Sequence, residues 1–211
     1  MEIAIGKFKV SGAALIALAA AYFFDSGGIL LVALTAAAVH EAGHFIALKI
    51  CRGRVTSLNL ELWGLTMRCD SRLSYKAEAI TAAAGPLVSL LFALTAAWAG
   101  RQFQSQEPYL LGGISFIFCI FNVLPALPLD GGKIVYALVA LKGGLDKAER
   151  FACVASCVVI LILLSTWTAL LLHTKVNFTL LLAALWLLIS YCKRSGVSIK
   201  SKRKIMEVKH G

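Results

Sequence analysis

The sequence predicts an all-α polytopic membrane protein, a bundle of six transmembrane helices with a small membrane-associated β-hairpin. Of its 211 residues, 59% are hydrophobic and only 15% are charged. Soluble domains contain about 45–50% apolar and about 25% charged residues, so this composition excludes an ordinary soluble domain. The apolar residues form long uncharged runs and the mean hydropathy is +0.81, as expected of membrane spans. The length leaves room for one bundle.

The predicted spans are uncharged runs long enough to cross a bilayer. They cover about residues 10–24, 27–48, 79–100, 109–124, 151–172 and 176–192. The first is short, and a signal peptide is the alternative interpretation of it, because a basic start precedes its apolar core.

Between the second and third spans the sequence changes character. Polar and apolar residues alternate from Val55 to Leu62, and Trp63-Gly64 then interrupts the pattern. Such alternation broken by a glycine is typical of a β-hairpin. We expect this hairpin at about residues 54–69, at the membrane interface, with an ordinary loop as the alternative.

Charge predicts the orientation. With a cytoplasmic amino terminus, six spans return the carboxyl terminus to the cytoplasm, and of the 21 Lys and Arg residues all except Arg101 and Lys175 face it. This asymmetry follows the positive-inside rule. The net charge of +10 therefore indicates topology and contact with anionic lipid rather than nucleic acid. We expect a membrane domain over residues 1–194 and a basic cytoplasmic tail over residues 195–211.

The second predicted span contains His40-Glu41-Ala42-Gly43-His44. The two histidines are four residues apart, so they share one helix face and can converge on one metal ion. Glu41 follows the first histidine, where its carboxylate can reach a water molecule instead of the metal. This arrangement is the zinc metalloprotease pattern. Ionisable groups inside a membrane span are costly, which favours a functional site over a structural role.

A catalytic zinc takes three protein ligands and keeps one open position. The strongest candidate for the third ligand is Asp130. It lies in a segment from Asn122 to Gly132 that contains two prolines and two glycines. We expect a distorted loop at membrane depth, sheltered by protein. The predicted span directions place this loop and the two histidines in the same cytoplasmic half of the bilayer, so one Zn²⁺ per chain is expected.

These motifs carry a resemblance to a known family. The histidine motif, a downstream N-x-x-P-x-x-P-L-D-G-G and Ala84-Gly85-Pro86-Leu87 resemble the site-2 protease family of intramembrane zinc metalloproteases, and within it the bacterial stage IV sporulation protease. The resemblance implies that His40, His44 and Asp130 bind zinc and that Glu41 is the general base. It also implies that Asn122 positions substrate or stabilises an oxyanion, and that the hairpin pairs with unwound substrate.

The function implied by this resemblance is a zinc metalloendopeptidase of a bacterial cytoplasmic membrane. It would cleave a transmembrane or membrane-tethered protein near the cytoplasmic face, with a sigma-factor precursor in sporulation as the expected substrate and inhibitory membrane proteins as expected partners. Two features depart from the sporulation relatives. Those relatives typically carry a soluble nucleotide-binding domain after the bundle, which the 211 residues do not include, and Ser89 stands where relatives often have an amide side chain.

Two other functions are open alternatives. A metal transporter could use the same ligands transiently, but transporters tend to show internal repeats, and none is apparent in the sequence. A catalytically silent membrane scaffold is the second alternative. Inactive relatives would be expected to lose a metal ligand or the general base, whereas His40, Glu41, His44 and Asp130 are all present.

Overall fold

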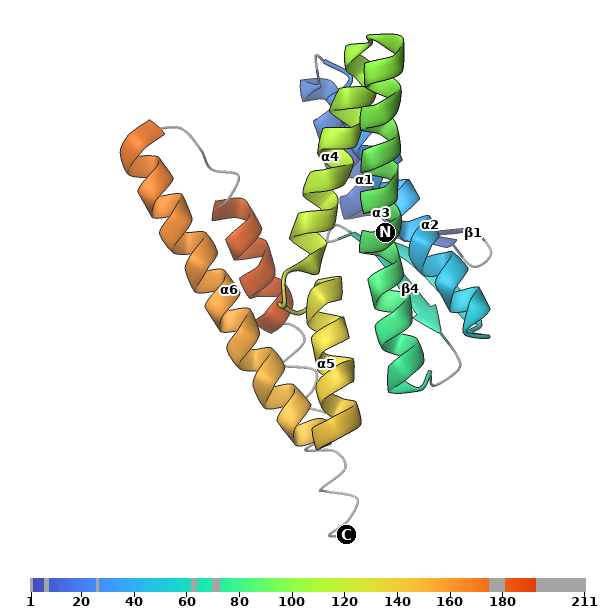
Figure 1. The fold of residues 1–211 in the computed structure, drawn as a ribbon, viewed down its shortest axis with the longest axis vertical. Helices are drawn as coiled ribbons and strands as arrows, with labels where there is room; N and C mark the ends of the chain where they lie inside the picture. The colour runs from blue at the N-terminus through green and yellow to red at the C-terminus, as the bar shows by residue number, and fades with distance from the viewer. Residues whose placement is uncertain are drawn as a thin grey trace.

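The computed structural model describes residues 2–5, 8–25, 27–61, 64–69, 73–174 and 181–192 (Figure 1). In chain order its elements are β1 (Glu2–Ile5), β2 (Phe8–Ser11), α1 (Gly12–Phe24), α2 (Ile29–Ile50), β3 (Val55–Glu61), β4 (Gly64–Cys69), α3 (Tyr75–Phe103), α4 (Gln106–Val123), α5 (Asp130–Gly143) and α6 (Leu145–Thr174). A further apolar helix covers Leu181–Cys192. The predicted tail lies outside the described residues.

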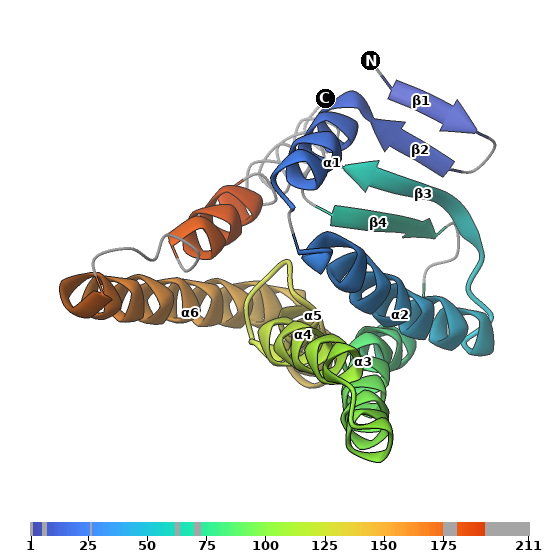
Figure 2. The ribbon, with the colours of Figure 1, turned by 90° about the horizontal axis from the view of Figure 1, so that it is seen from above.

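The four strands form one sheet in the order β1-β2-β3-β4. Strands β3 and β4 pair antiparallel over the residues predicted as a hairpin, with Val55 opposite Cys69, while β2 joins β3 in parallel. The described residues are mostly helical, as predicted, but strands β1 and β2 were not expected. Figure 2 shows the sheet on the side of α2 away from α3. Trp63 of the predicted turn lies outside the described residues, and the hairpin's place at a membrane interface stays a prediction.

Within the described part of the chain, three helices are long and apolar enough to cross a membrane by length and composition: α2, α3 and α6. The other predicted spans correspond to α1, with 13 residues, to α4, with 18, and to the helix Leu181–Cys192, the first part of whose predicted span is not described. The six-span count therefore stays a prediction. Helix α3 begins at Tyr75, four residues before the predicted span, because the Ser74 hydroxyl accepts from the Ala77 amide and caps the helix.

Helix α5 was not predicted. The whole stretch from Asn122 to Gly132 was expected to be a loop, but the structure places Asp130 in the first turn of α5. An acidic residue is stabilised there by the helix dipole. A β-carbon at Gly131 would overlap the Val123 backbone. Glycine is therefore required at position 131 because the start of α5 packs closely against the end of α4, and not because the backbone is irregular there.

Helix α3 is the centre of the bundle and packs against α2, α4 and α5. Its buried face consists of small residues that recur every three or four positions. They are Ala79, Ala82, Gly85, Pro86, Ser89, Ala93, Ala96 and Gly100. Small side chains let helix backbones approach closely in a membrane, where packing rather than the hydrophobic effect holds helices together. This face therefore sets the distance of α2 and α5 from α3.

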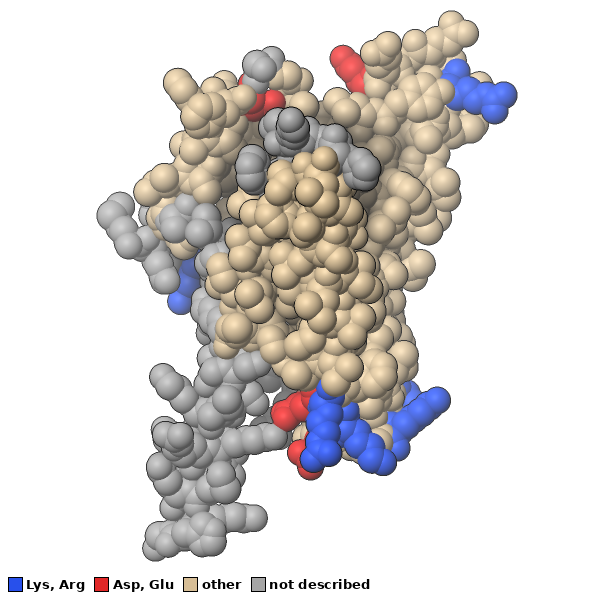
Figure 3. All heavy atoms as spheres, turned by 90° about the vertical axis from the view of Figure 1, so that its left-hand side faces the viewer, with Lys and Arg blue, Asp and Glu red and all other residues tan. Residues whose placement is uncertain are grey.

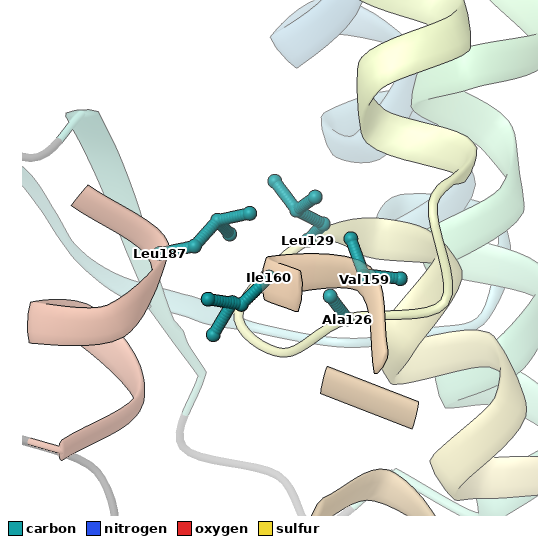
Figure 4. Close-up of a cluster of buried hydrophobic side chains, with 5 residues drawn as sticks. All are labelled: Ala126, Leu129, Val159, Ile160 and Leu187. Atoms are coloured by element: carbon teal, nitrogen blue, oxygen red, sulfur yellow. The ribbon is translucent and has the colours of Figure 1, made fainter. Parts of the chain in front are cut away.

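Helix α6 lies apart from this centre. It packs on α5 and extends away from α2, α3 and α4 in the view of Figure 2. A buried apolar cluster links it to the loop 124–129 and to the last described helix (Figure 4). The cluster consists of Ala126, Leu129, Val159, Ile160 and Leu187. The loop that precedes Asp130 therefore rests on α6.

The surface supports a membrane location. On the face drawn in Figure 3, charged side chains gather mainly at the two ends of the molecule, with a nearly uncharged region between them. Large apolar side chains stand out from the helices, among them Leu161 of α6, which is 65% exposed. Contiguous apolar surface of this extent is unusual in a soluble monomer and is expected where lipid surrounds the helices.

Candidate metal centre

Two histidines of α2 and one aspartate of α5 converge in the interior. The Nε2 atoms of His40 and His44 are 3.1 Å apart. Each lies 3.0 Å from Oδ2 of Asp130. All three side chains are buried, with at most 7% of the residue surface exposed. His40 and His44 lie 90 and 86 residues before Asp130 in the chain. The three ligand atoms nevertheless form one compact triangle.

The outer nitrogen of His44 fixes the protonation of its ring. Nδ1 of His44 donates to the carbonyl oxygen of Thr81 at 2.8 Å. A carbonyl oxygen only accepts, so Nδ1 carries the proton and the neutral ring presents a lone pair at Nε2. That lone pair faces the Asp130 carboxylate, which is also an acceptor. Two facing acceptors need a second proton or a metal cation between them, so the arrangement is compatible with a metal site.

His40 is held by a second residue of α3. Its Nδ1 lies 2.9 Å from the hydroxyl oxygen of Ser89, whose residue is 1% exposed. Metal-binding histidines usually donate their other ring N–H to such a partner, which orients the ring and sets its tautomer. With Nδ1 donating to Ser89, the Nε2 lone pair of His40 is directed at the same point as that of His44.

Asp130 is oriented by a lysine of its own helix. The ammonium of Lys133 lies 2.8 Å from Oδ1 of Asp130, while Oδ2 faces the two histidines. One carboxylate oxygen is therefore committed to a cation and the other is available as a ligand. The Lys133 side chain is 43% exposed, whereas that of Asp130 is 4% exposed. The lysine charge therefore lies at the border between the buried centre and the surface of the molecule.

The ring of His44 is seated in a space that a glycine creates. A β-carbon on Gly85 of α3 would overlap the imidazole. On α2 itself, a β-carbon on Gly43 would come within 2.8 Å of the Ala84 carbonyl oxygen and 3.0 Å of Val88. These two glycines bring α2 and α3 into backbone contact at the level of the centre. The resulting spacing lets a histidine of α2 reach a backbone carbonyl of α3.

Glu41 and Asn122 lie beside the triangle rather than in it. Glu41 is half-buried next to His40, and its carboxylate interacts electrostatically with His44, His40 and Asp130. Asn122 is half-buried in the last turn of α4, and its amide donates to the Phe118 carbonyl at 3.0 Å. The role in substrate binding expected of Asn122 stays a prediction.

The donor set suits zinc. Two imidazole nitrogens and one carboxylate oxygen are a common ligand set for catalytic zinc, at bond lengths of about 2.0–2.2 Å. Ligand atoms of a tetrahedral ion at such distances are separated by roughly 3.3 Å, close to the observed 3.0 and 3.1 Å. Among the described residues, His40, His44 and Asp130 form the group able to hold a metal ion.

The supporting residues were missed from the sequence. Nothing in the local pattern marks Ser89, Lys133 or the Thr81 carbonyl as partners of the ligands. One usable signal was present: Gly85 and Ser89 are four residues apart on α3, and both belong to its small-residue face. A polar residue within such a face indicates contact with something polar on the neighbouring helix.

Comparisons with known proteins identify relatives of this chain. A protein of Synechocystis sp. (strain ATCC 27184 / PCC 6803 / Kazusa) named as a zinc metalloprotease is 34% identical over 116 residues, which is 52% of this chain and 30% of that protein. A zinc metalloprotease of Methanocaldococcus jannaschii is 29% identical over 120 residues, covering 54% of this chain and 35% of that protein. The chain thus spans about a third of the length of these relatives.

The fold is also shared with a solved structure. The Site-2 Protease from Methanocaldococcus jannaschii matches with a TM-score of 0.66 and 21% identity, over 90% of this chain and 92% of that chain. The family model Peptidase family M50 matches residues 106–166, a range that includes Asp130. The model Peptidase M50B-like matches residues 13–128, more than half of the chain and a range that includes His40 and His44. This chain belongs to the M50B-like peptidase family.

Proposed function

We propose that this protein is an intramembrane zinc metalloendopeptidase. The observation that carries the proposal is the convergence of His40, His44 and Asp130 within 3.1 Å of one another, in a chain whose helices present apolar surface on the outside. His40 and His44 would hold the zinc through Nε2, and Asp130 would hold it through Oδ2. One ion per chain is expected.

The chemistry follows from the side chains around this centre. Zinc, when bound, supplies a Lewis acid that polarises a carbonyl group and lowers the pKa of water. Glu41 accepts a proton from the water that attacks the scissile carbonyl and delivers that proton to the leaving amine. His40 and His44 keep their orientation throughout, because Ser89 and the Thr81 carbonyl hold their outer nitrogens.

The substrate class is a transmembrane or membrane-tethered protein. A helix hides its carbonyls in its own hydrogen bonds, so cleavage requires an extended stretch of substrate. Strand β4 is at one edge of the sheet, and an edge strand can receive such a stretch by strand addition. Asn122, at the end of α4, would donate to the peptide or to the developing oxyanion after leaving its present partner.

The location follows from charge. With six spans and cytoplasmic termini, all Lys and Arg residues except Arg101 and Lys175 lie on the cytoplasmic side. This distribution follows the positive-inside rule, and the membrane would be a bacterial cytoplasmic membrane. Cleavage would then occur near the cytoplasmic face, where release of a tethered transcription factor has a direct effect. A sigma-factor precursor in sporulation, and membrane proteins that inhibit its cleavage, are the substrate and partners that the sequence resemblance favours.

The test separates metal binding from proteolysis. The purified chain is reconstituted with a membrane-tethered sigma-factor precursor, and zinc content and cleavage are measured for wild type, Glu41→Gln and Asp130→Asn. Glu41→Gln should keep zinc and lose cleavage, because only the base is removed. Asp130→Asn should lose both. Glu107→Gln, an exposed acid in the first turn of α4, is the matched control and should behave as wild type.

The outcomes distinguish the rival functions. Undiminished cleavage by Glu41→Gln would overturn the proposed mechanism. Zinc near one ion per chain, with no cleavage of any membrane-tethered protein in a panel of precursors, would indicate a catalytically silent scaffold. Zinc uptake into sealed vesicles that is unaffected by Glu41→Gln would indicate a transporter.

A further inference from the structure

We infer that Ser156 of α6 is a positioning residue for the metal centre, which it reaches through the loop 124–129. The inference rests on the proposed function, since it concerns the same zinc site. Helix α6 supplies none of the three ligands, but it packs on α5 and shares a buried apolar cluster with this loop. Its effect on the centre is therefore indirect.

The loop 124–129 has few ways to hold its shape by itself. Pro125 and Pro128 carry no backbone N–H. The amide of Ala126 donates to the Leu124 carbonyl, and that of Leu129 to the Ala126 carbonyl, both at 2.8 Å. These short-range bonds define a turn, but they do not fix where the turn lies relative to α2 and α3.

Leu127 supplies the connection to another element. Its amide donates to the hydroxyl oxygen of Ser156 at 3.0 Å, and that hydroxyl donates to the Ala152 carbonyl at 2.7 Å. Ser156 is fully buried and Leu127 is 5% exposed. Because both residues are buried, removal of the hydroxyl would leave the Leu127 amide without its present partner, a costly state for a buried backbone group.

The apolar cluster completes the attachment. Ala126 and Leu129 of the loop pack against Val159 and Ile160, which lie one turn after Ser156 on α6 (Figure 4). Leu129 is the residue directly before Asp130 and the N-cap of α5. The loop that leads into α5 is thus attached to α6 through Ser156 and this cluster. Movement of the loop would displace Oδ2 of Asp130 from the two histidines.

The experiment measures zinc affinity and ligand geometry on the full chain in detergent. Affinity is obtained by competition with a chromogenic chelator, and geometry from the visible absorption of the Co²⁺-substituted protein. Ser156→Ala should bind zinc roughly tenfold more weakly, in the range known for loss of outer partners of metal ligands, and should show an altered Co²⁺ spectrum. A purely structural contribution to stability would leave that spectrum unchanged.

The control is another serine with the same local chemistry. Ser115 of α4 is also fully buried, and its hydroxyl donates to the carbonyl of Leu111, four residues earlier, at 2.8 Å. Ser115→Ala removes the same atoms but leaves the Leu127 amide bonded to Ser156. It should keep the wild-type affinity and spectrum. An equal loss of zinc affinity in Ser115→Ala would overturn the assignment, because the effect would then not depend on the bond between Ser156 and Leu127.

A second pair of variants covers the case in which Ser156→Ala does not fold. Val159→Ala shortens a side chain that is 7% exposed and faces the loop, whereas Val158→Ala makes the same change at a side chain that is 48% exposed. Val159→Ala should weaken zinc binding several-fold, by the lost packing of a buried methyl pair, and Val158→Ala should not. Equal affinities in this pair contradict the role of α6.

Failure of this inference and failure of the proposed function are distinguishable. A wild-type chain that binds zinc but cleaves nothing contradicts the protease function alone. Equal zinc affinities and identical Co²⁺ spectra in wild type and Ser156→Ala contradict the positioning role alone. A wild-type chain that binds no zinc overturns both.

Discussion

Gly85 lies so close to His44 that a β-carbon at position 85 would overlap the imidazole ring. The glycine is thus a spatial requirement of the metal centre, although it offers no ligand atom. His44 in turn reaches the Thr81 carbonyl of the same helix α3, one turn before Gly85. The ring is therefore enclosed by α3 on one face and anchored to it at Nδ1.

Substitution of Gly85 by alanine should reduce zinc affinity by about tenfold or more, since overpacking of this kind costs about 1–3 kcal/mol. Chelator competition on the purified protein measures the change. Gly113→Ala on α4 is the control, because a β-carbon there meets nothing within 4 Å, and its zinc affinity should equal that of wild type. A Gly85→Ala protein with unchanged affinity would show that His44 can shift without loss.

Ser89→Ala should lower zinc affinity by roughly 10- to 100-fold, because His40 loses the partner that orients its ring. The Co²⁺-substituted protein should show a changed visible spectrum. Thr95→Ala provides the comparison on the same helix: its exposed hydroxyl donates to the Phe92 carbonyl, and its removal should alter neither quantity. Equal spectra for Ser89→Ala and wild type would contradict the assigned partner.

Lys133→Met should weaken zinc binding by roughly two- to tenfold, the size expected of a partly exposed ion pair with additional hydrogen bonding. Without the lysine, both oxygens of Asp130 are free to rotate towards the site. Lys133→Arg should restore most of the affinity. Lys142→Met removes an exposed lysine from the last turn of the same helix and should have no effect. If Lys133→Arg binds zinc as weakly as Lys133→Met, the positive charge at position 133 is not what orients Asp130.

Asp25→Ala should destabilise the protein by about 1 kcal/mol. The Asp25 carboxylate accepts from the amides of Ile29 and Leu30 at 3.0 and 2.9 Å, at the start of the helix that carries both histidines. Thermal unfolding in detergent, followed by circular dichroism, measures the effect. Ser105 precedes α4 without such a side-chain bond, so Ser105→Ala should leave the midpoint unchanged. Equal shifts in the two variants would exclude a capping role.

The ligand set could be predicted because ionisable residues are scarce in the apolar segments. His40 and His44 share a helix face by their spacing alone, and Asp130 is the acidic residue between the two glycines and the prolines of an apolar stretch. Their convergence is now a feature of the structure. The zinc ion and the role of each residue remain predictions, and the family assignment of the chain rests on the comparisons.

Other parts of the fold could not be predicted, because they depend on contacts between residues that are far apart in the chain. Strand β2 has four residues, and its pairing with β3 joins Phe8 to Leu58, which no local pattern reveals. Gly131 and Gly132 suggested a loop because glycine weakens helices. Tertiary packing reversed that preference, since the glycines are needed where α5 starts against the end of α4. Ser89 could not be identified as the partner of His40, because the sequence does not show which faces of α2 and α3 are in contact.

The small-residue face of α3 has a consequence for metal selectivity. Because α2 rests on that face at Gly85, the size of the residue at this position affects where His44 stands relative to the other ligands. The spacing of the ligand atoms therefore depends on helix packing around the centre as well as on the ligands themselves. Ions of different radius could be favoured by changing residues that never touch the metal.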